Sequence, residues 1–194
     1  MKKLDGLKKI NTAVFISGKG SNLKNLIKFS LLKNSKFNVN LVISNNYKAK
    51  GLIYAKNFNI KRKIINYNKI KKAENKILLL LKKNKIKLVC LAGYMKILSK
   101  NFIKKFKGKI VNIHPSLLPK YKGLYTHQRA IDNKEKYSGC TVHFVNSKLD
   151  SGKIILQKKV KIKKKENSKN LAKRVLKQEH LLYPEALTKI YSSF

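Results

Sequence analysis

Short apolar runs alternate with segments of helical periodicity from residue 11 to residue 114, and this alternation restricts the possible folds more than any other feature of the chain. The helical segments cover 23–32, 49–58, 73–83 and 99–106. Strand-like runs stand before, between and after them, over 11–17, 37–44, 61–66, 86–94 and 110–114. Strands that alternate with helices form right-handed β-α-β units and pair in parallel within one sheet. The run 86–94, IKLVCLAGY, is almost wholly apolar, which is typical of a strand buried on both faces.

The pattern changes after Gly123. A short helix is predicted over 126–133, and two strand-like runs, 139–145 and 153–162, follow with only the loop 146–152 between them. So short a connection is typical of a hairpin, which makes this edge of the sheet antiparallel.

Helical periodicity returns over 167–191 and closes the chain. A length of 194 residues is enough for one substantial core. We therefore expect an α/β fold: a single Rossmann-like domain over 1–194, with a mostly parallel sheet, helices on both faces and an antiparallel C-terminal edge. Residues 1–10 are expected to form a flexible extension.

The charge of the chain raises the question of a polyanionic partner. Lys and Arg number 47 against 8 Asp and Glu, a formal net charge of +39, and such a field attracts nucleic acid. However, only Arg62, Arg129 and Arg174 are arginines, the residue that sites for bases and phosphates favour. The lysines are spread along the whole chain among many Asn and Ile, the residues that AT-rich codons encode. We expect no specific nucleic-acid partner, and nucleic-acid binding stays the alternative function.

Several other classes of protein are disfavoured. Cys90 and Cys140 lie in strand-like runs without C-x-x-C spacing, so both are expected to be buried thiols. No pair of histidines has the spacing of a metal site, so no metal is expected. The chain has no uncharged stretch long enough to span a membrane and no signal-peptide core, which predicts a cytoplasmic protein without membrane contact.

Candidate functional groups follow the strand-like runs, because ligands of a parallel sheet bind at the carboxyl ends of its strands. The turn GKGSN, 18–22, leads into a helix and can bind an anion with its N–H groups, although a plain turn with Ser21 as helix cap is the alternative. The segment 92–98 offers apolar side chains and Lys96, or it is ordinary core with one solvated lysine.

Asn112 and His114 alternate along the last parallel strand and so point to the same face. Asp150 lies in the hairpin loop, where an aspartate often serves only the turn. An amide, an imidazole and a carboxylate, without a covalent nucleophile, suit direct transfer of a group between two bound substrates.

Six segments then identify a family. ISGKGSNL, LAGYMKILS, VNIHPSLLPKYKGLYTHQRAI, GCTVHFV, LDSGKIILQ and QEHLLYP, in this order over about 12–184, closely resemble the glycinamide ribonucleotide formyltransferases of purine biosynthesis. The resemblance implies the formyltransferase fold. It also implies transfer of a formyl group from 10-formyltetrahydrofolate, as co-substrate, to the amine of glycinamide ribonucleotide, without a metal.

The resemblance also assigns site residues. The catalytic residues would be Asn112, His114 and Asp150. The ribonucleotide would be bound by Gly20, Ser21, Asn22 and Glu179. The folate would be bound by Met95, Lys96, Ile97, Leu98, Asn112, Asn146, Ser147, Lys148, Leu149 and Asp150.

The chain departs from the family at three places. Lys96 replaces an arginine, which weakens a two-point contact with the acidic tail of the folate. The lysines of 69–72 stand where a second arginine is usual. Ser151 replaces a glycine and is expected to stiffen its loop. The related methionyl-tRNA formyltransferases and formyltetrahydrofolate deformylases carry additional domains, which we do not expect here, and another enzyme of this superfamily stays an alternative function. We expect a monomer or a weak homodimer acting on small-molecule substrates.

Overall fold

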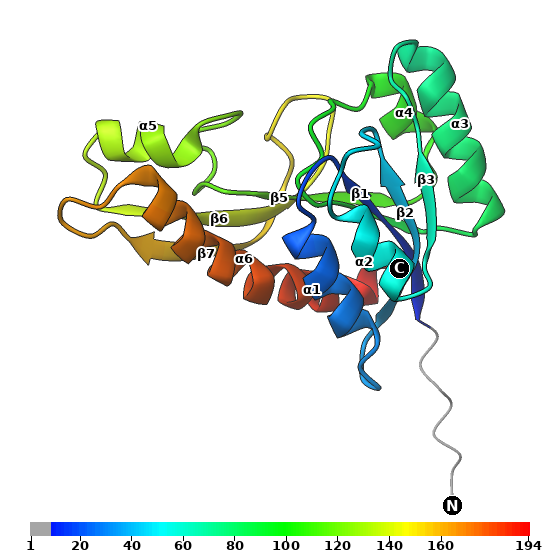
Figure 1. The fold of residues 1–194 in the computed structure, drawn as a ribbon, viewed down its shortest axis with the longest axis horizontal. Helices are drawn as coiled ribbons and strands as arrows, with labels where there is room; N and C mark the ends of the chain where they lie inside the picture. The colour runs from blue at the N-terminus through cyan, green and yellow to red at the C-terminus, as the bar shows by residue number, and fades with distance from the viewer. Residues whose placement is uncertain (1–8) are drawn as a thin grey trace, which may run out of the picture.

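The computed structural model describes residues 9–194, and one seven-stranded sheet runs through them (Figure 1). Its strands are β1 (Ile10–Ile16), β2 (Phe37–Ser44), β3 (Lys61–Ile64), β4 (Leu88–Leu91), β5 (Lys109–His114), β6 (Tyr137–Phe144) and β7 (Ile154–Lys161). They lie in the order β3-β2-β1-β4-β5-β6-β7.

The five N-terminal strands of the sheet are parallel, and β6 and β7 are antiparallel to their neighbours. The predicted mostly parallel sheet with an antiparallel C-terminal edge is therefore confirmed. The strand order reverses between β1 and β4, and at such a point the segments that leave neighbouring strands diverge and open a crevice for ligands. Ser17 and Gly93, which follow these two strands, remain in contact through an N–H···O bond of 3.1 Å.

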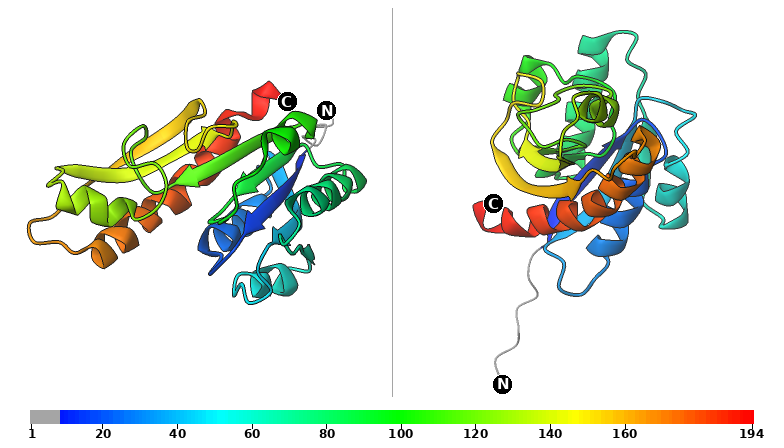
Figure 2. Two further views of the ribbon diagram at one scale, coloured as in Figure 1. Left: turned by 90° about the horizontal axis from the view of Figure 1, so that it is seen from above. Right: turned by 90° about the vertical axis from the view of Figure 1, so that its left-hand side faces the viewer.

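Helices cover both faces of the sheet, as Figure 2 shows. They are α1 (Ser21–Ser30), α2 (Leu52–Asn57), α3 (Ile70–Lys83), α4 (Lys100–Lys105), α5 (Thr126–Asp132) and α6 (Ser168–Lys189), with a final 3₁₀ turn at Tyr191–Ser193. Side chains of α1, α2 and α6 pack in a core on one face, and those of α3 and α4 pack in a second core on the other.

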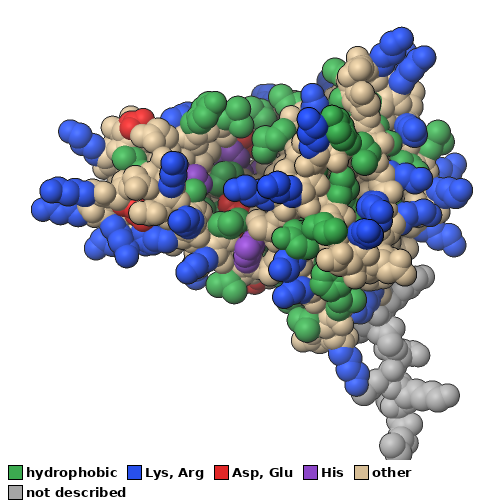
Figure 3. Space-filling model, viewed as in Figure 1, with side chains coloured by type: hydrophobic (Ala, Val, Ile, Leu, Met, Phe, Trp, Pro, Cys, Tyr) green, Lys and Arg blue, Asp and Glu red, His purple; other side chains and the backbone are tan. Residues whose placement is uncertain are grey.

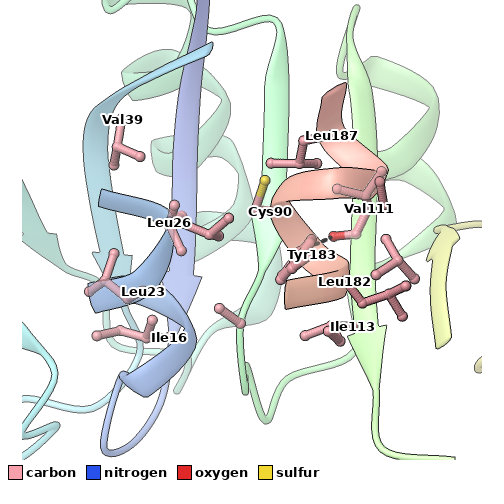
Figure 4. Close-up of a cluster of buried hydrophobic side chains, with 14 of the residues drawn as sticks. Ile16, Leu23, Leu26, Val39, Cys90, Val111, Ile113, Leu182, Tyr183 and Leu187 are labelled. Carbon is pink, nitrogen blue, oxygen red and sulfur yellow. Dashed lines mark hydrogen bonds between the residues drawn. The ribbon is translucent and has the colours of Figure 1, made fainter. Parts of the chain in front are cut away.

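Tyr183 of α6 lies at the centre of the first core (Figure 4). It is fully buried, and its hydroxyl lies 3.0 Å from the carbonyl oxygen of Leu91 and 3.2 Å from that of Val111. The C-terminal helix is thereby fixed to β4, the central strand of the sheet, and to its neighbour β5. Cys90 and Cys140 are buried in the same core, as predicted, and burial raises the pKa of the Cys140 thiol to about 12.

The structure differs from the sequence prediction at several element ends. The fourth strand was expected over 86–94 but ends at Leu91, because Gly93 turns the chain with a φ of +70°. The third helix begins at Ile70 rather than at residue 73. Of the extension expected over 1–10, Ile10 is the first residue of β1, and residues 1–8 lie outside the described residues.

Candidate active site

The C-terminal end of β5 carries two of the three side chains to which the resemblance assigns catalysis. Asn112 and His114 are two positions apart on the strand, so both leave the sheet on the same face. His114 is 5 % exposed. Asp150 comes from the loop between β6 and β7, and this loop lies beside β5 because β6 pairs with β5. The hairpin therefore brings the three side chains together.

Both ring nitrogens of His114 face oxygen atoms. Nε2 lies 2.9 Å from the main-chain carbonyl oxygen of Tyr121, and Nδ1 lies 3.3 Å from Oδ2 of Asp150. Because a carbonyl oxygen only accepts, Nε2 carries a hydrogen and donates it to Tyr121. Nδ1 is therefore the nitrogen that remains for proton exchange, with the carboxylate beside it.

The carboxylate of Asp150 is enclosed by polar groups, and its side chain is 7 % exposed. Oδ2 also accepts the main-chain N–H of Gly123 at 2.9 Å. Oδ1 lies 3.5 Å from Nδ2 of Asn112 and 3.7 Å from Nε2 of His143. Asp150 itself has a φ of 44°, in the left-handed region that aspartate tolerates better than most residues. The loop conformation and these contacts together fix the position of the carboxylate.

The loop that carries Asp150 approaches β6 closely. A Cβ on Gly152 would lie 1.7 Å from the carbonyl oxygen of Phe144, so only glycine fits there. Ser151 is tolerated because its side chain points outward: its hydroxyl accepts from Nζ of Lys122 at 2.6 Å and donates to the carbonyl of Leu149 at 2.8 Å. Ser151 therefore ties this loop to the segment at Lys122, which is consistent with the expected stiffening.

His143 joins this cluster, although the sequence alone does not single it out. It lies opposite Asn112 in the β5–β6 pairing and beside a register shift of β6 against β7. Its Nδ1 lies 2.8 Å from the carbonyl oxygen of Phe144, and its Nε2 lies 3.2 Å from Nδ2 of Asn112. Burial lowers the pKa of His143, which favours the neutral ring. A neutral ring that donates from Nδ1 accepts at Nε2, so His143 orients the amide of Asn112. The alternation of residues along the predicted hairpin is the signal that points to it.

A second histidine, His127 of α5, lies close enough to His114 for their charges to interact. Burial lowers the pKa of His127, and the charge of a protonated His114 lowers it further. Its buried Nδ1 has no hydrogen-bond partner among residues 9–194.

The turn that follows β1 leaves the first N–H groups of α1 uncapped. Gly20, with a φ of 72°, is the N-cap residue, and no side chain caps the helix there. The alternative in which Ser21 caps α1 is therefore wrong. A Cβ on Gly20 would lie 2.6 Å from Cα of Gly51, so glycine is required by the close approach as well as by φ. N–H groups of a first helical turn have no acceptor within the helix, and together with the helix dipole they attract an anion.

Asn22 and Glu179, which are 157 residues apart in the sequence, meet between α1 and α6. Nδ2 of Asn22 donates to Oε2 of Glu179 at 2.6 Å, and both side chains are buried. Burial raises the pKa of Glu179, and the bond from Asn22 partly opposes this. Oδ1 of Asn22 has no partner within residues 9–194. Two residues expected to bind the ribonucleotide are therefore in contact, next to the turn at Gly20 and Ser21.

The first segment that the resemblance assigns to folate follows β4. Met95 and Ile97 are 64 % and 72 % exposed, which is unusual for such side chains in a segment next to buried polar groups. Lys96 has its Nζ 6.0 Å from the centre of the Tyr67 ring. Leu98 is instead buried in the second core and supports the segment from below.

The second folate segment follows β6. Val145 packs against the second core, which also contains Leu98, and the loop 146–150 follows it. Asn146 shapes this loop by donating to the carbonyl of Ser151 at 3.1 Å and accepting the N–H of Lys148 at 2.9 Å. Ser147, Lys148 and Leu149 are exposed.

Figure 3 shows histidine and acidic side chains near the middle of one face and lysines spread around them rather than gathered in one stripe. Within residues 9–194, no three His, Cys, Asp or Glu side chains are grouped as a metal site requires, and independence from metal stays a prediction. None of the described helices is long and apolar enough to cross a membrane.

Comparison with known proteins agrees with this geometry. Residues 10–187 match the formyl transferase family. The chain belongs to the formyl transferase family. Among solved formyl transferases, phosphoribosylglycinamide formyltransferase from Brucella melitensis is 41 % identical, with a TM-score of 0.90 over 95 % of this chain and 96 % of that one. The expected formyltransferase fold is therefore confirmed.

Two curated relatives define the extent of the similarity. Phosphoribosylglycinamide formyltransferase of Haemophilus influenzae is 42 % identical over 92 % of this chain and 84 % of its own length. The human trifunctional purine biosynthetic protein adenosine-3 is 42 % identical over 95 % of this chain, but this formyl transferase spans only 19 % of the length of that protein.

Proposed function

We propose that this formyl transferase moves the formyl group of 10-formyltetrahydrofolate to the amine of glycinamide ribonucleotide, as a step of purine biosynthesis. The relatives that are named phosphoribosylglycinamide formyltransferases support this acceptor. The observation that carries the proposal is the convergence of His114 and Asn112 on Asp150, at 3.3 and 3.5 Å. These are the groups that direct formyl transfer between two bound substrates needs, namely donors for an oxyanion and a carrier of protons.

In the proposed reaction the amine attacks the formyl carbon, and the formyl oxygen becomes an oxyanion. His114 donates to this oxygen from Nδ1, because Nε2 is engaged by the carbonyl of Tyr121. One such donor contributes about 3 to 4 kcal/mol to the transition state in well-studied enzymes. The charge of Asp150, 3.3 Å from Nδ1, stabilises the protonated ring, and the single hydrogen on Nδ1 is shared between this carboxylate and the oxyanion. Through a water molecule, Asp150 passes the proton of the amine to the folate nitrogen, whose bond to the formyl carbon breaks as the oxyanion collapses.

Asn112 is the second donor in the proposed mechanism. One hydrogen of its Nδ2 goes to His143 at 3.2 Å, and the other points to Asp150 at 3.5 Å, the limit of a hydrogen bond. The second hydrogen can therefore turn to an oxyanion at little cost. His143 keeps the amide in the orientation that makes this possible.

The phosphate of the ribonucleotide is proposed to bind at the start of α1. Main-chain N–H groups of Gly20, Ser21 and Asn22 supply donors there, and a monophosphate needs no larger nucleotide-binding loop. Glu179, held by Asn22, is proposed to contact the sugar. The buried Oδ1 of Asn22, which has no partner in the described part of the chain, supports a polar ligand at this place.

The folate is proposed to lie between the segments 95–98 and 146–150. The exposed side chains of Met95, Ile97 and Leu149 offer an apolar surface to its ring system. Lys96 supplies a cation for its acidic tail, as a single point charge rather than a fork. Asn146, Ser147 and Lys148 complete the loop side, and Leu98 contributes by supporting Ile97 from the core.

We further propose that the protein acts in the cytoplasm as a monomer or weak homodimer on these two small-molecule substrates. Its charge of +39 comes from basic residues spread along the whole chain, and we propose that it serves no specific nucleic acid. No step of the proposed reaction needs a metal, since the donors to the oxyanion are side chains.

The test is a formyl-transfer assay with several acceptors. The purified protein is mixed with 10-formyltetrahydrofolate and, in separate reactions, with glycinamide ribonucleotide, with methionyl-tRNA or with no acceptor. Release of tetrahydrofolate and the mass of the formylated product are measured. We expect product only with the ribonucleotide. Formylation of the tRNA, or hydrolysis without an acceptor, would assign the protein to another formyl transferase activity, and no reaction at all would leave the nucleic-acid alternative.

A further inference from the structure

Tyr121 has a backbone conformation that needs an explanation. Its φ is 56°, in the left-handed region, where a residue with a Cβ costs about 1 to 2 kcal/mol. In this conformation its carbonyl oxygen lies 2.9 Å from Nε2 of His114. Two residues later, the N–H of Gly123 donates to Asp150 at 2.9 Å. The short segment 121–123 thus contacts both members of the His114–Asp150 pair through main-chain atoms. Such strain persists only where the surroundings hold it.

Two side chains hold the ring of Tyr121. The hydroxyl donates to Oε1 of Glu135 at 2.8 Å. The guanidinium carbon of Arg129 lies 5.2 Å from the centre of the ring, and Nη1 of Arg129 donates to the carbonyl of Lys122 at 2.7 Å. We name Tyr121, Arg129 and Glu135 the tyrosine clamp. Glu135 holds the hydroxyl of the ring, and Arg129 holds both the face of the ring and the carbonyl of the next residue, Lys122.

The chain uses scarce residue types for this clamp. It has only three arginines and 8 acidic residues. A planar guanidinium can lie over a ring and donate to a carbonyl at the same time, which the point charge of a lysine does poorly. Glu135 also accepts from Nζ of Lys120 at 2.7 Å, and the bonds from Lys120 and Tyr121 lower the pKa of Glu135, so it is an anion at neutral pH. In a chain where lysine is the common cation, an arginine contacts the segment whose main chain binds His114 and Asp150.

We propose that Tyr121 is a positioning residue for formyl transfer, because the tyrosine clamp holds its carbonyl against Nε2 of His114 and thereby leaves Nδ1 facing Asp150. This inference rests on the proposed function. If an anchor is lost, the segment can relax from its left-handed conformation, and the peptide that bears the carbonyl turns away. His114 then loses the acceptor at Nε2. This acceptor fixes the orientation of the ring and determines that Nδ1 is the nitrogen that exchanges a proton.

Conservative variants of the clamp test this inference in the full-length protein. Tyr121→Phe removes the bond to Glu135 but keeps the ring. Arg129→Met removes the guanidinium with its contacts to the Tyr121 ring and to the carbonyls of Lys122 and Leu124. We expect kcat to fall about five- to tenfold in each, with the KM of both substrates within about twofold of the wild type. Their combination should lose less than the product of the single losses, since both loosen one segment. Tyr47→Phe and Arg62→Met, at an exposed ring and on the exposed strand β3, are the matched controls and should leave kcat unchanged.

A second readout does not depend on activity. Amide hydrogen exchange at Gly123 reports the segment directly, and we expect it to be about tenfold faster in both clamp variants at an unchanged melting temperature. Normal exchange with lowered kcat, or faster exchange with normal kcat, would overturn the inference. If the wild type transfers no formyl group, the proposed function fails by itself; unchanged exchange at Gly123 would then also overturn the clamp, and faster exchange would support it.

Discussion

Asp150→Asn tests the proposed catalytic cluster, because asparagine has nearly the same shape as aspartate but carries no charge. At 3.3 Å, a carboxylate and a protonated imidazole attract by about 5 kcal/mol at an effective dielectric constant of about 20. The new amide would also place its NH₂ group against a donor in either orientation, the N–H of Gly123 at Oδ2 or Nδ2 of Asn112 at Oδ1. The loss of this attraction slows the reaction only by the amount by which the attraction is stronger in the transition state than in the ground state. A share of about 3 kcal/mol corresponds to a loss of kcat of about a hundredfold or more.

The assay is the initial rate of tetrahydrofolate release at saturating substrates, with thermal unfolding measured alongside. Asp132→Asn is the control, because Asp132 is exposed on α5 and its carboxylate accepts from Gln128 of the same helix at 2.7 Å. His114→Ala should lose at least as much activity as Asp150→Asn. Turnover of Asp150→Asn within about threefold of the wild type, at an intact fold, would remove Asp150 from the mechanism.

Three further predictions concern the ribonucleotide site and the charge. Ser21→Asp should stabilise α1 by up to about 1 kcal/mol, yet raise the KM of the ribonucleotide at least about tenfold because the new carboxylate repels the phosphate. The control Ser168→Asp, at the start of α6, should stabilise its helix without changing this KM. Equal KM values in the two variants would contradict the phosphate site. Because burial raises the pKa of Glu179, the folded protein holds that proton more tightly than the unfolded chain and loses stability as pH rises from the usual value of 4.5. Glu179→Gln should therefore melt at a higher temperature than the wild type at neutral pH, lose this difference in acid, and raise the ribonucleotide KM; a lower melting temperature at neutral pH would refute the sign. Binding to oligonucleotides should be weak, indifferent to sequence and steeply salt-dependent, and a preference of about a thousandfold for any one of them at physiological salt would revive a nucleic-acid function.

The sheet and the placement of the three candidate catalytic side chains could be predicted because they follow from local patterns. Alternation along a strand places Asn112 and His114 on one face, and a short hairpin returns Asp150 to that strand. The contact between His114 and Asp150 therefore needs only the hairpin and the end of β5, both of which are legible in the sequence.

The contacts that the sequence could not predict depend on register and on main-chain atoms. His143 meets Asn112 only because the two residues are opposite each other across β5 and β6. The contact of the Tyr121 carbonyl with His114 involves a main-chain atom that every residue type has, so the residue type at position 121 does not predict it. The close approach of Gly51 to Gly20 could not be predicted from the sequence either, since it depends on two main-chain segments. Any side chain at position 20 would clash with Gly51 and disturb the turn itself.

The contact between Asn22 and Glu179 joins the first helix to the last. A ribosome therefore has to complete nearly the whole chain before the two partners can meet. A nascent chain that ends within α5 already contains the phosphate turn, Asn112 and His114, but it lacks the carboxylate that holds Asn22. We therefore expect the proposed ribonucleotide to protect chains that contain α6 against proteolysis and to have little effect on chains truncated before it.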